Sequence, residues 1–238
     1  MTRPLITSYT WSPDKGGGFV RDMRVRWALE EIGQAYDVRW LDWGEQKAPA
    51  HRARSPFGQV PTYEEDGLVL FESGAILLHI AQKWPGLLPA DPAGRARAIE
   101  WMFAALNSVE PVVWDLTIAR IIEGKEEWAQ ARLPSVMGRL SKRLDELAAR
   151  LGSNEWLDGQ FSAGDLLMVH VLRNLKPSGT LAAWSGLAAY VARGEARPAF
   201  GRALAALRAG QTGDPPADMG VLKSRFGGQP DRDEGETK

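Results

Sequence analysis

The first third of the chain alternates between the hydrophobic patterns of strands and of helices. Apolar and aromatic side chains occupy alternate positions in residues 4–11 and again in residues 35–41, which predicts two β-strands. Between them, residues 19–32 space apolar side chains three or four apart, and Gly33 follows as a glycine typical of a helix end. A helix between two strands predicts a βαβ unit with parallel strands and a right-handed crossover.

The pattern then changes to a hairpin followed by a second helix. Residues 60–63 and 68–71 are short apolar runs, and the Asp-Gly pair that ends at Gly67 is a strong signal of a tight turn. A helix is predicted over residues 73–83, and the proline that follows ends it. The polar segment before the hairpin predicts a loop with one helical turn. The order βαβ-ββα therefore predicts a small α/β domain with a mixed four-stranded sheet.

Strand signals stop after residue 84, and helical spacing fills most of the remaining chain. Residues 85–94 hold three prolines and two glycines, which predicts a linker. Apolar spacing then predicts an all-α bundle, with helices over residues 93–123, 126–151, 163–175, 186–193 and 198–209. Glycine, proline and charge dominate the end of the chain, which predicts a flexible tail. The predicted units are an α/β domain, a linker, an all-α domain and a tail, at residues 1–84, 85–94, 95–210 and 211–238.

Composition and charge exclude several classes of function. The formal charge is −1, which gives no electrostatic footprint for nucleic acid or an anionic membrane, and we interpret the arginines of residues 21–26 as a solvated helix face. The chain has no cysteine and only three histidines, which lie far apart, so neither a cysteine nucleophile nor a metal site is expected. The longest apolar stretch, residues 75–81, is too short to cross a bilayer, and the N-terminus does not have the pattern of a signal peptide. The expected location is the cytoplasm.

Two motifs around the hairpin carry candidate binding chemistry. In Val60-Pro61 the residue before proline is held extended, so its backbone can pair with an extended peptide. Glu72-Ser73 opens the helix that follows the hairpin. The free N–H groups of that helix end and the Ser73 hydroxyl suit a carboxylate, and the Glu72 carboxylate suits an ammonium group. Ser73 could instead simply cap the helix.

Three segments resemble the cytosolic glutathione transferase family, and the resemblance covers about residues 4–209. They are SPFGQVP at residues 55–61, FESGAILLHIAQKW at residues 71–84 and FSAGDLLM at residues 161–168. The third contains a helix-capping pattern, which we interpret as structural. The resemblance implies a thioredoxin-like N-terminal domain, a helical C-terminal domain, a homodimer and glutathione as co-substrate without a metal. It also implies a cis bond between Val60 and Pro61.

The resemblance also implies a role for each motif in binding glutathione. Val60 and Pro61 present backbone to the tripeptide, Glu72 and Ser73 hold its γ-glutamyl end, and Gln59 reaches its glycyl carboxylate. Four residues of the preceding loop are weaker candidates for that carboxylate, namely Gln46, Lys47, His51 and Arg54.

The sequence leaves the group that activates the glutathione thiol open. Family members place a Tyr, Ser or Cys at or just after the first strand, and this chain offers Tyr9, Thr10 and Ser12 there. Ser12 is the first candidate because a proline follows it, Thr10 is the second, and the backbone N–H groups of residues 16–19 are the third. The loop is longer than the family's, and alignment from the helix places Phe19 or Val20 at the usual serine position.

The second substrate is expected between the two domains. The candidates for an apolar electrophile pocket are Trp11, Phe19, Met102, Phe103, Asn107 and Trp114. The predicted function is a transferase that ionises the glutathione thiol for attack on an apolar electrophile or for reduction of a disulfide or peroxide. The alternative is a non-catalytic binding module of the same fold.

Overall fold

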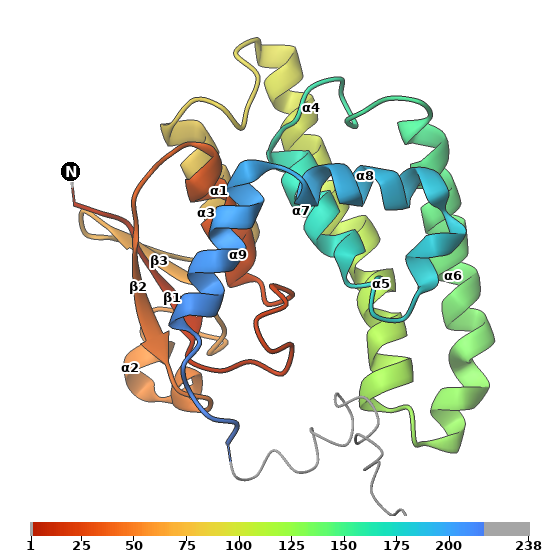
Figure 1. Ribbon diagram of the computed structural model, residues 1–238, viewed down its shortest axis with the longest axis horizontal. Helices are drawn as coiled ribbons and strands as arrows, with labels where there is room; N and C mark the ends of the chain where they lie inside the picture. The colour runs from red at the N-terminus through yellow and green to blue at the C-terminus, as the bar shows by residue number, and fades with distance from the viewer. Residues whose placement is uncertain (1, 217–238) are drawn as a thin grey trace, which may run out of the picture.

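The structure is a computed structural model that describes residues 2–216. Figure 1 shows a sheet with its helices on one side of the molecule and a group of long helices on the other, with α9 beside the sheet domain. The predicted tail falls largely on residues 217–238, which lie outside the described residues.

The N-terminal part is the predicted mixed sheet with helices. Its elements are β1 (Leu5–Tyr9), α1 (Asp22–Glu31), β2 (Asp37–Leu41), η1 (Glu45–Lys47), α2 (Pro49–Arg52), β3 (Thr62–Glu65), β4 (Leu68–Phe71) and α3 (Ser73–Lys83). The strand order is β2-β1-β3-β4, with β1 parallel to β2 and β3 antiparallel to both of its neighbours. This is the thioredoxin-like topology, so the predicted fold class of the domain is confirmed.

Local signals explain where these elements begin and end. The turn between β3 and β4 places Asp66 at φ 47° and Gly67 at φ 84°, the left-handed pair that a two-residue hairpin requires. Helix α1 begins three residues later than predicted. It follows a loop in which Gly16 and Gly18 take φ values of 74° and 73°, which a helix does not allow.

The C-terminal part is helical throughout, as predicted. Its elements are α4 (Pro92–Phe103), η2 (Ala104–Val109), α5 (Glu110–Thr117), η3 (Ile118–Ile122), α6 (Glu127–Leu151), α7 (Ala163–Arg173), η4 (Thr180–Ala183), α8 (Ser185–Glu195) and α9 (Pro198–Gly210). Helix α4 starts inside the predicted linker because the Asp91 carboxylate accepts from the Gly94 N–H at 2.7 Å and caps it. The capping box of Ser162 and Asp165 at α7 is present.

The two parts share one hydrophobic core, and α1 lies at its centre. Helix α1 packs against α3 of its own domain and against α7 and α9 of the helical part. Trp27 of α1 is fully buried, and its ring lies 5.8 Å from Phe161 and 5.1 Å from Phe200. The middle of α1 is therefore held by aromatic side chains of the helical part. The predicted domain boundary at residues 85–94 stays a prediction.

Candidate functional site

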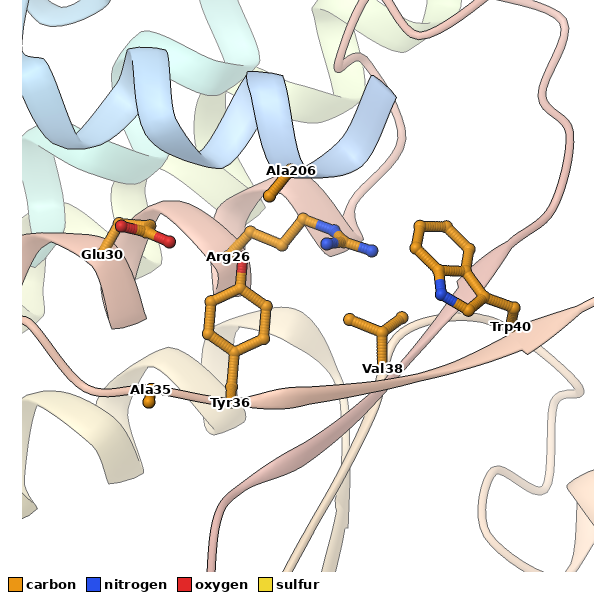
Figure 2. A pocket seen from close by; sticks show the side chains of 7 residues that line it. All are labelled: Arg26, Glu30, Ala35, Tyr36, Val38, Trp40 and Ala206. Atoms are coloured by element: carbon orange, nitrogen blue, oxygen red, sulfur yellow. The ribbon is translucent and has the colours of Figure 1, made fainter. Parts of the chain in front are cut away.

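Among the cavities on the described surface, two differ clearly in the residues that form their walls. The larger, about 290 Å³, lies between α1, β2 and α9 and contains none of the predicted site residues (Figure 2). The smaller lies where the loop before β3 meets the start of α3. Its walls are Arg21, Ser55, Gln59, Val60, Pro61, Phe71, Glu72 and Ser73. All five residues predicted to bind glutathione are among them, so the structure brings these five together.

The loop that carries Val60 presents free backbone to the smaller cavity. The Val60–Pro61 peptide bond is cis. Among the described residues, no hydrogen bond uses the Val60 N–H or C=O. Two of the weaker candidates brace this loop, since His51 Nε2 lies 2.9 Å from the Gln59 carbonyl and Lys47 Nζ donates to the Gly58 carbonyl at 3.0 Å. The rigid loop can therefore pair with an extended peptide.

The other two weaker candidates have partners of their own. The Gln46 side chain is buried and accepts from the Gly44 N–H at 2.7 Å. The Arg54 guanidinium donates to Glu64 at 2.9 Å. Neither lines the smaller cavity, so both act within the loop in this conformation.

Glu72 and Ser73 line the same cavity as Val60. Glu72 takes φ 69° and ψ 113°, an uncommon backbone for a residue other than glycine, and its carbonyl begins α3 by accepting from the Ile76 N–H. The Ser73 hydroxyl accepts from Arg24 Nη1 at 3.1 Å. Because it accepts there, its own proton stays free to donate to an anion at the start of α3.

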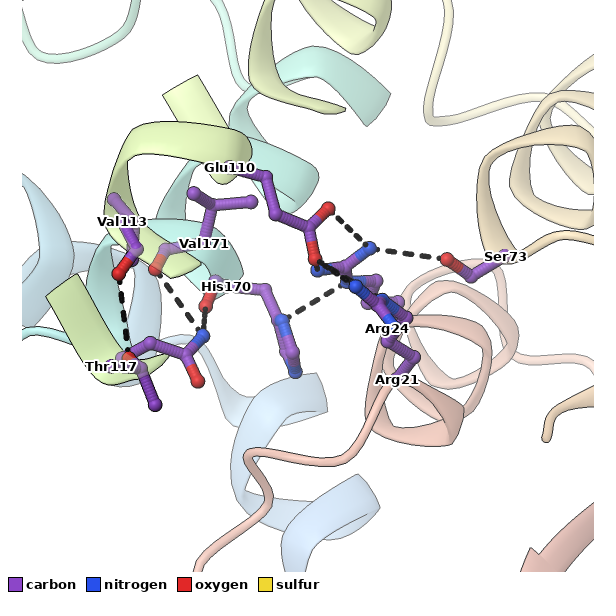
Figure 3. A network of polar contacts seen from close by, with 9 residues as sticks. Arg21, Arg24, Ser73, Glu110, Val113, Thr117, His170 and Val171 are labelled. Carbon is purple, nitrogen blue, oxygen red and sulfur yellow. Dashed lines mark hydrogen bonds and ion pairs between the residues drawn. The ribbon is translucent and has the colours of Figure 1, made fainter. Parts of the chain in front are cut away.

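A buried polar network lies behind Ser73 and joins the two parts of the molecule (Figure 3). Arg24 donates to Ser73, to His170 Nδ1 at 3.0 Å and to Glu110 at 2.9 and 3.2 Å. Arg21 donates to the same Glu110 carboxylate at 2.8 Å. Burial alone raises the pKa of Glu110, but Arg24 and Arg21 outweigh it and hold that pKa below its ordinary value. Glu110 is therefore ionised at neutral pH.

His170 serves this network as a neutral acceptor. It is fully buried, and its Nδ1 accepts from Arg24, so the ring proton lies on Nε2. Burial and then the charge of Arg24 hold the pKa of His170 well below its ordinary value of 6.5. The ring positions Arg24 and carries no charge at neutral pH.

The arginines of α1 correct the interpretation of residues 21–26 as a solvated face. Arg24 and Arg26 are each 1% exposed, because their acidic partners lie in the same buried layer. Arg21 is partly exposed and lines the smaller cavity, so it is a site residue that the sequence reading missed. The sequence did contain a signal that the α1 arginines are not simply solvated. The apolar residues of α1 are not confined to one face of the helix, so its other faces are also expected to contact protein.

The two hydroxyls predicted to activate the thiol already have acidic partners. Ser12 is 1% exposed; it donates to the Asp14 carboxylate and accepts from Gln211 Nε2 at 2.8 Å. The Thr10 hydroxyl donates to Asp42 at 2.7 Å. A hydroxyl has one proton to donate, so either residue must leave its carboxylate before it can serve a thiolate. Their roles stay predictions.

The third candidate, the backbone of residues 16–19, is also partly engaged. The Gly17 N–H donates to the Asp14 carbonyl at 2.9 Å and the Phe19 N–H donates to the Asp14 carboxylate at 2.7 Å. Arg173 binds the Gly17 and Gly18 carbonyls at 2.9 and 2.7 Å. The loop is thus held from α7, and its free N–H groups are fewer than the sequence suggested.

Tyr9, the last residue of β1, leaves its hydroxyl available. Its ring belongs to a small apolar cluster with Leu41 and Val60, and it lies 5.0 Å from the Trp43 ring. No hydrogen bond among the described residues uses its hydroxyl. Burial and then the charge of Asp22 raise the pKa of Tyr9 to about 12, so the group stays a proton donor at neutral pH.

The residues predicted to line an electrophile pocket are spread over different surroundings. Met102 is 3% exposed and lies in the core, where it packs rather than faces a ligand. Trp11 lies edge-on to Trp43 at 5.9 Å, and Phe19 lies beneath the Arg173 guanidinium at 4.9 Å. Phe103, Asn107 and Trp114 are exposed. None of the six lines either cavity, so this pocket stays a prediction.

Residues 2–216 contain no group of three or more His, Asp or Glu side chains placed to hold a metal ion. No helix in the same range is long and apolar enough to span a bilayer.

Comparison with known proteins identifies the family. The family profile described as the glutathione S-transferase N-terminal domain matches residues 16–82. Glutathione S-transferase 4 of Zea mays is 31% identical over 208 residues, which cover 79% of this chain and 90% of the maize protein. The chain belongs to the glutathione S-transferase family.

Solved structures of other glutathione transferases share its fold. A family member from Pseudomonas fluorescens, with two glutathione bound, is 25% identical, has a TM-score of 0.74 and covers 85% of this chain and 92% of its own. A glutathione transferase from Burkholderia graminis, with two glutathione molecules bound per subunit, is 28% identical with the same TM-score and covers 85% and 87%. The smaller cavity lies in the thioredoxin-like domain that these comparisons match.

Proposed function

We propose that this transferase binds glutathione in the smaller cavity. The cysteinyl backbone pairs antiparallel with Val60, and Gln59, which is exposed, reaches the glycyl carboxylate. The Ser73 hydroxyl and the free N–H groups of α3 hold the γ-glutamyl carboxylate, and Glu72 holds the ammonium group beside it. Arg21 adds a positive charge to the same wall.

One observation carries this proposal. Two motifs that are separated by a hairpin in the sequence line one cavity, the first with free backbone at Val60 and the second with the Glu72 carboxylate and the Ser73 hydroxyl. An α-amino acid carries its two charges on one carbon, so an acid and a hydroxyl in adjacent positions match it. The cysteinyl sulfur of a tripeptide bound in this way points toward Tyr9 and the end of β1.

The proposed reaction is transfer of the glutathione thiolate to an apolar electrophile. A hydroxyl at the end of β1 donates to the sulfur and lowers its pKa, so the thiol releases its proton to solvent. The thiolate then attacks the electrophilic carbon and forms a C–S bond, and the leaving group departs with the electron pair of the bond that breaks. Glutathione-dependent reduction of a disulfide or peroxide uses the same thiolate. Because the cytosol keeps glutathione reduced, this chemistry also supports the predicted cytoplasmic location.

A non-catalytic binding module is the second candidate, and a specific observation favours it. The Thr10 and Ser12 hydroxyls donate to Asp42 and Asp14, so the two predicted activators are engaged elsewhere. A protein of this kind binds glutathione without ionising its thiol. Both candidate functions include glutathione binding, so affinity does not distinguish them. The fraction of bound glutathione that is present as thiolate does.

Calorimetric titration of glutathione tests the binding site. We expect Ser73→Ala to weaken binding by about tenfold to a hundredfold, because one hydrogen bond to a charged group contributes about 1.5–3 kcal/mol. Ser185→Ala is the matched control, since Ser185 also opens a helix but lies in α8, away from the cavity, and we expect no change. Equal affinities of the Ser73 variant and the wild type would show that glutathione, if bound, lies elsewhere.

We also propose that the protein acts as a homodimer through the β4 edge. Strand β4 ends the sheet, and it exposes the apolar side chains of Leu68, Val69 and Phe71. Phe57 projects beside them with 63% of its surface exposed, and its ring lies 6.1 Å from the Phe71 ring. Exposed apolar side chains on an edge strand favour burial against a second copy.

Replacing Phe57 tests the dimer. We expect Phe57→Asp to convert the dimer to a monomer, or to raise its dissociation constant at least tenfold, because the new carboxylate would have to be buried without a partner. Sedimentation velocity over a range of concentrations measures this change. Trp128→Asp is the control, since Trp128 is 54% exposed on α6, far from β4 in the sequence and the fold. A wild-type protein that sediments as a monomer contradicts the proposal.

A further inference from the structure

Three side chains of the segment that contains η1 and α2 bond to the main chain of the loop that carries Val60. They are Lys47 at the end of η1, His51 in α2 and Ser55 in the turn after it, and they lie four residues apart in the sequence. All three reach the main chain of residues 57–59. The loop is therefore held by side chains at regular spacing, directly before the residue that is proposed to pair with glutathione.

The loop is held at three successive carbonyls. Lys47 Nζ donates to those of residues 57 and 58, at 3.2 and 3.0 Å. His51 Nε2 lies 2.9 Å from the carbonyl oxygen of Gln59. The Gln59 N–H in turn donates to the Ser55 hydroxyl oxygen at 3.3 Å. The main chain of Gln59 is thus held at both of its polar groups.

The loop lies close against this segment, and its contacts there are buried. Gly58 takes φ 59°, and a Cβ at this position would lie 2.6 Å from the Gln46 carbonyl oxygen, so glycine permits the close approach. His51 and Ser55 are 3% and 2% exposed. Their hydrogen bonds to Gln59 have little competition from water, so the main chain of Gln59 keeps one orientation.

The hydrogen bond of His51 determines which way the next amide points. A carbonyl oxygen only accepts, so His51 donates to Gln59 through Nε2–H. The Gln59–Val60 peptide bond is trans, so its C=O and N–H point in opposite directions. Because the carbonyl is turned toward His51, the Val60 N–H is turned away from it. Val60 lines the smaller cavity and His51 does not.

We propose that His51 is a positioning residue of the glutathione site, which directs the Val60 N–H at the cysteinyl carbonyl of the bound tripeptide. The role rests on the proposed glutathione site, and it assigns the His51 ring to the protein main chain instead of the glycyl carboxylate. Among the described residues the buried Nδ1 atom has no hydrogen-bond partner, so the bond to Gln59 is the polar contact that the ring makes there. An amide that is oriented before binding loses less conformational entropy when the ligand arrives.

Calorimetric titration of the full-length protein with S-methylglutathione tests this role. The probe keeps the tripeptide backbone and has no ionisable thiol, so its affinity reports on backbone recognition. We expect His51→Phe, which keeps a ring and removes the donor, to weaken binding by about fivefold or more, the effect of losing one ordinary hydrogen bond. His51→Gln should restore most of the affinity, because its side-chain amide can donate in place of Nε2. A ring that only fills space predicts the reverse order of the two variants.

His79→Phe is the matched control, since His79 lies on α3 and does not line the cavity, and we expect it to leave the affinity unchanged. The role of His51 is overturned, and the glutathione site stands, if His51→Phe binds S-methylglutathione as tightly as the wild type. The same conclusion follows if His51→Gln binds it no more tightly than His51→Phe. A wild-type protein that does not bind the probe overturns the glutathione site and this role with it.

A measurement on the wild type tests the same role without any variant. Nitrogen-15 NMR of the imidazole groups shows which ring nitrogen carries the proton. We expect His51 to carry it on Nε2 in the protein without ligand, as the bond to the Gln59 carbonyl requires. A His51 ring whose single proton lies on Nδ1 would contradict the proposal, because its Nε2 could not donate to Gln59.

Discussion

We expect Tyr9→Phe to lower kcat/KM for conjugation of glutathione with an activated aryl chloride by about tenfold to a hundredfold. The phenol is the one side-chain hydroxyl at the end of β1 that has no hydrogen-bond partner among the described residues. A hydrogen bond to a charged group contributes about 1.5–3 kcal/mol, and each 1.4 kcal/mol is a factor of ten. Phenylalanine keeps the packing against Val60 and removes only the donor.

The pH dependence of kcat/KM shows whether Tyr9→Phe raises or lowers the apparent pKa of the glutathione thiol. The pKa of Tyr9 is raised to about 12, so the phenol is protonated throughout the neutral range and does not itself titrate there. Removal of this donor destabilises the bound thiolate, so the apparent pKa in the kcat/KM profile moves upward. The rate deficit should therefore shrink as the pH rises, since the thiol then ionises without help.

Ser12→Ala and Thr10→Ala, measured beside Tyr9→Phe, decide which hydroxyl acts. If Tyr9 acts, both alanine variants keep the wild-type apparent pKa. A raised pKa in Ser12→Ala alone assigns the role to Ser12, as the sequence first suggested, and contradicts the assignment to Tyr9.

Glu110→Ala should lower the free energy of unfolding by about 3–5 kcal/mol, the usual cost of removing one partner from a buried ion pair. Arg24 is almost fully buried, and without Glu110 its charge keeps only the neutral partners Ser73 and His170. Urea denaturation measures the change. Because Arg24 also holds Ser73, glutathione affinity should fall in the same variant.

A double variant separates two contributions to the stability loss of Glu110→Ala, namely the unpaired charge of Arg24 and the lost side-chain packing. Replacement of Arg24 by Met together with Glu110 by Leu removes both charges and leaves apolar side chains of similar length, so it should be more stable than Glu110→Ala. If Glu110→Ala unfolds at the wild-type urea concentration, the network contributes little and Ser73 is positioned by its helix alone.

The sequence predicted those elements well whose backbone φ and ψ angles are determined by the types of two or three adjacent residues. The Asp66-Gly67 turn fixed the hairpin, and the residues around Val60-Pro61 and Glu72-Ser73 marked the two walls that meet in the smaller cavity. Each of these signals depends on φ and ψ preferences of adjacent residues. Such preferences can be read without knowledge of the tertiary structure.

Contacts between distant segments could not be predicted in this way. Arg24 is buried because Glu110 and His170, 86 and 146 residues away along the chain, converge on it. The Ser12 hydroxyl is engaged by Asp14 and by Gln211, which the sequence assigned to a flexible tail. The Gly213 N–H likewise donates to the Thr10 carbonyl at 2.9 Å. A pattern of apolar spacing carries no information about these partners.

Titration of glutathione into the wild-type protein at neutral pH, followed by the ultraviolet absorbance of the thiolate, shows whether the protein ionises the bound thiol. We expect thiolate absorbance to rise saturably with glutathione, because the bound thiol ionises below the ordinary cysteine pKa of about 8.5. Saturable binding without thiolate would contradict the transferase mechanism and leave the binding module. No binding at all would contradict the assignment of Val60, Glu72 and Ser73 to the glutathione site.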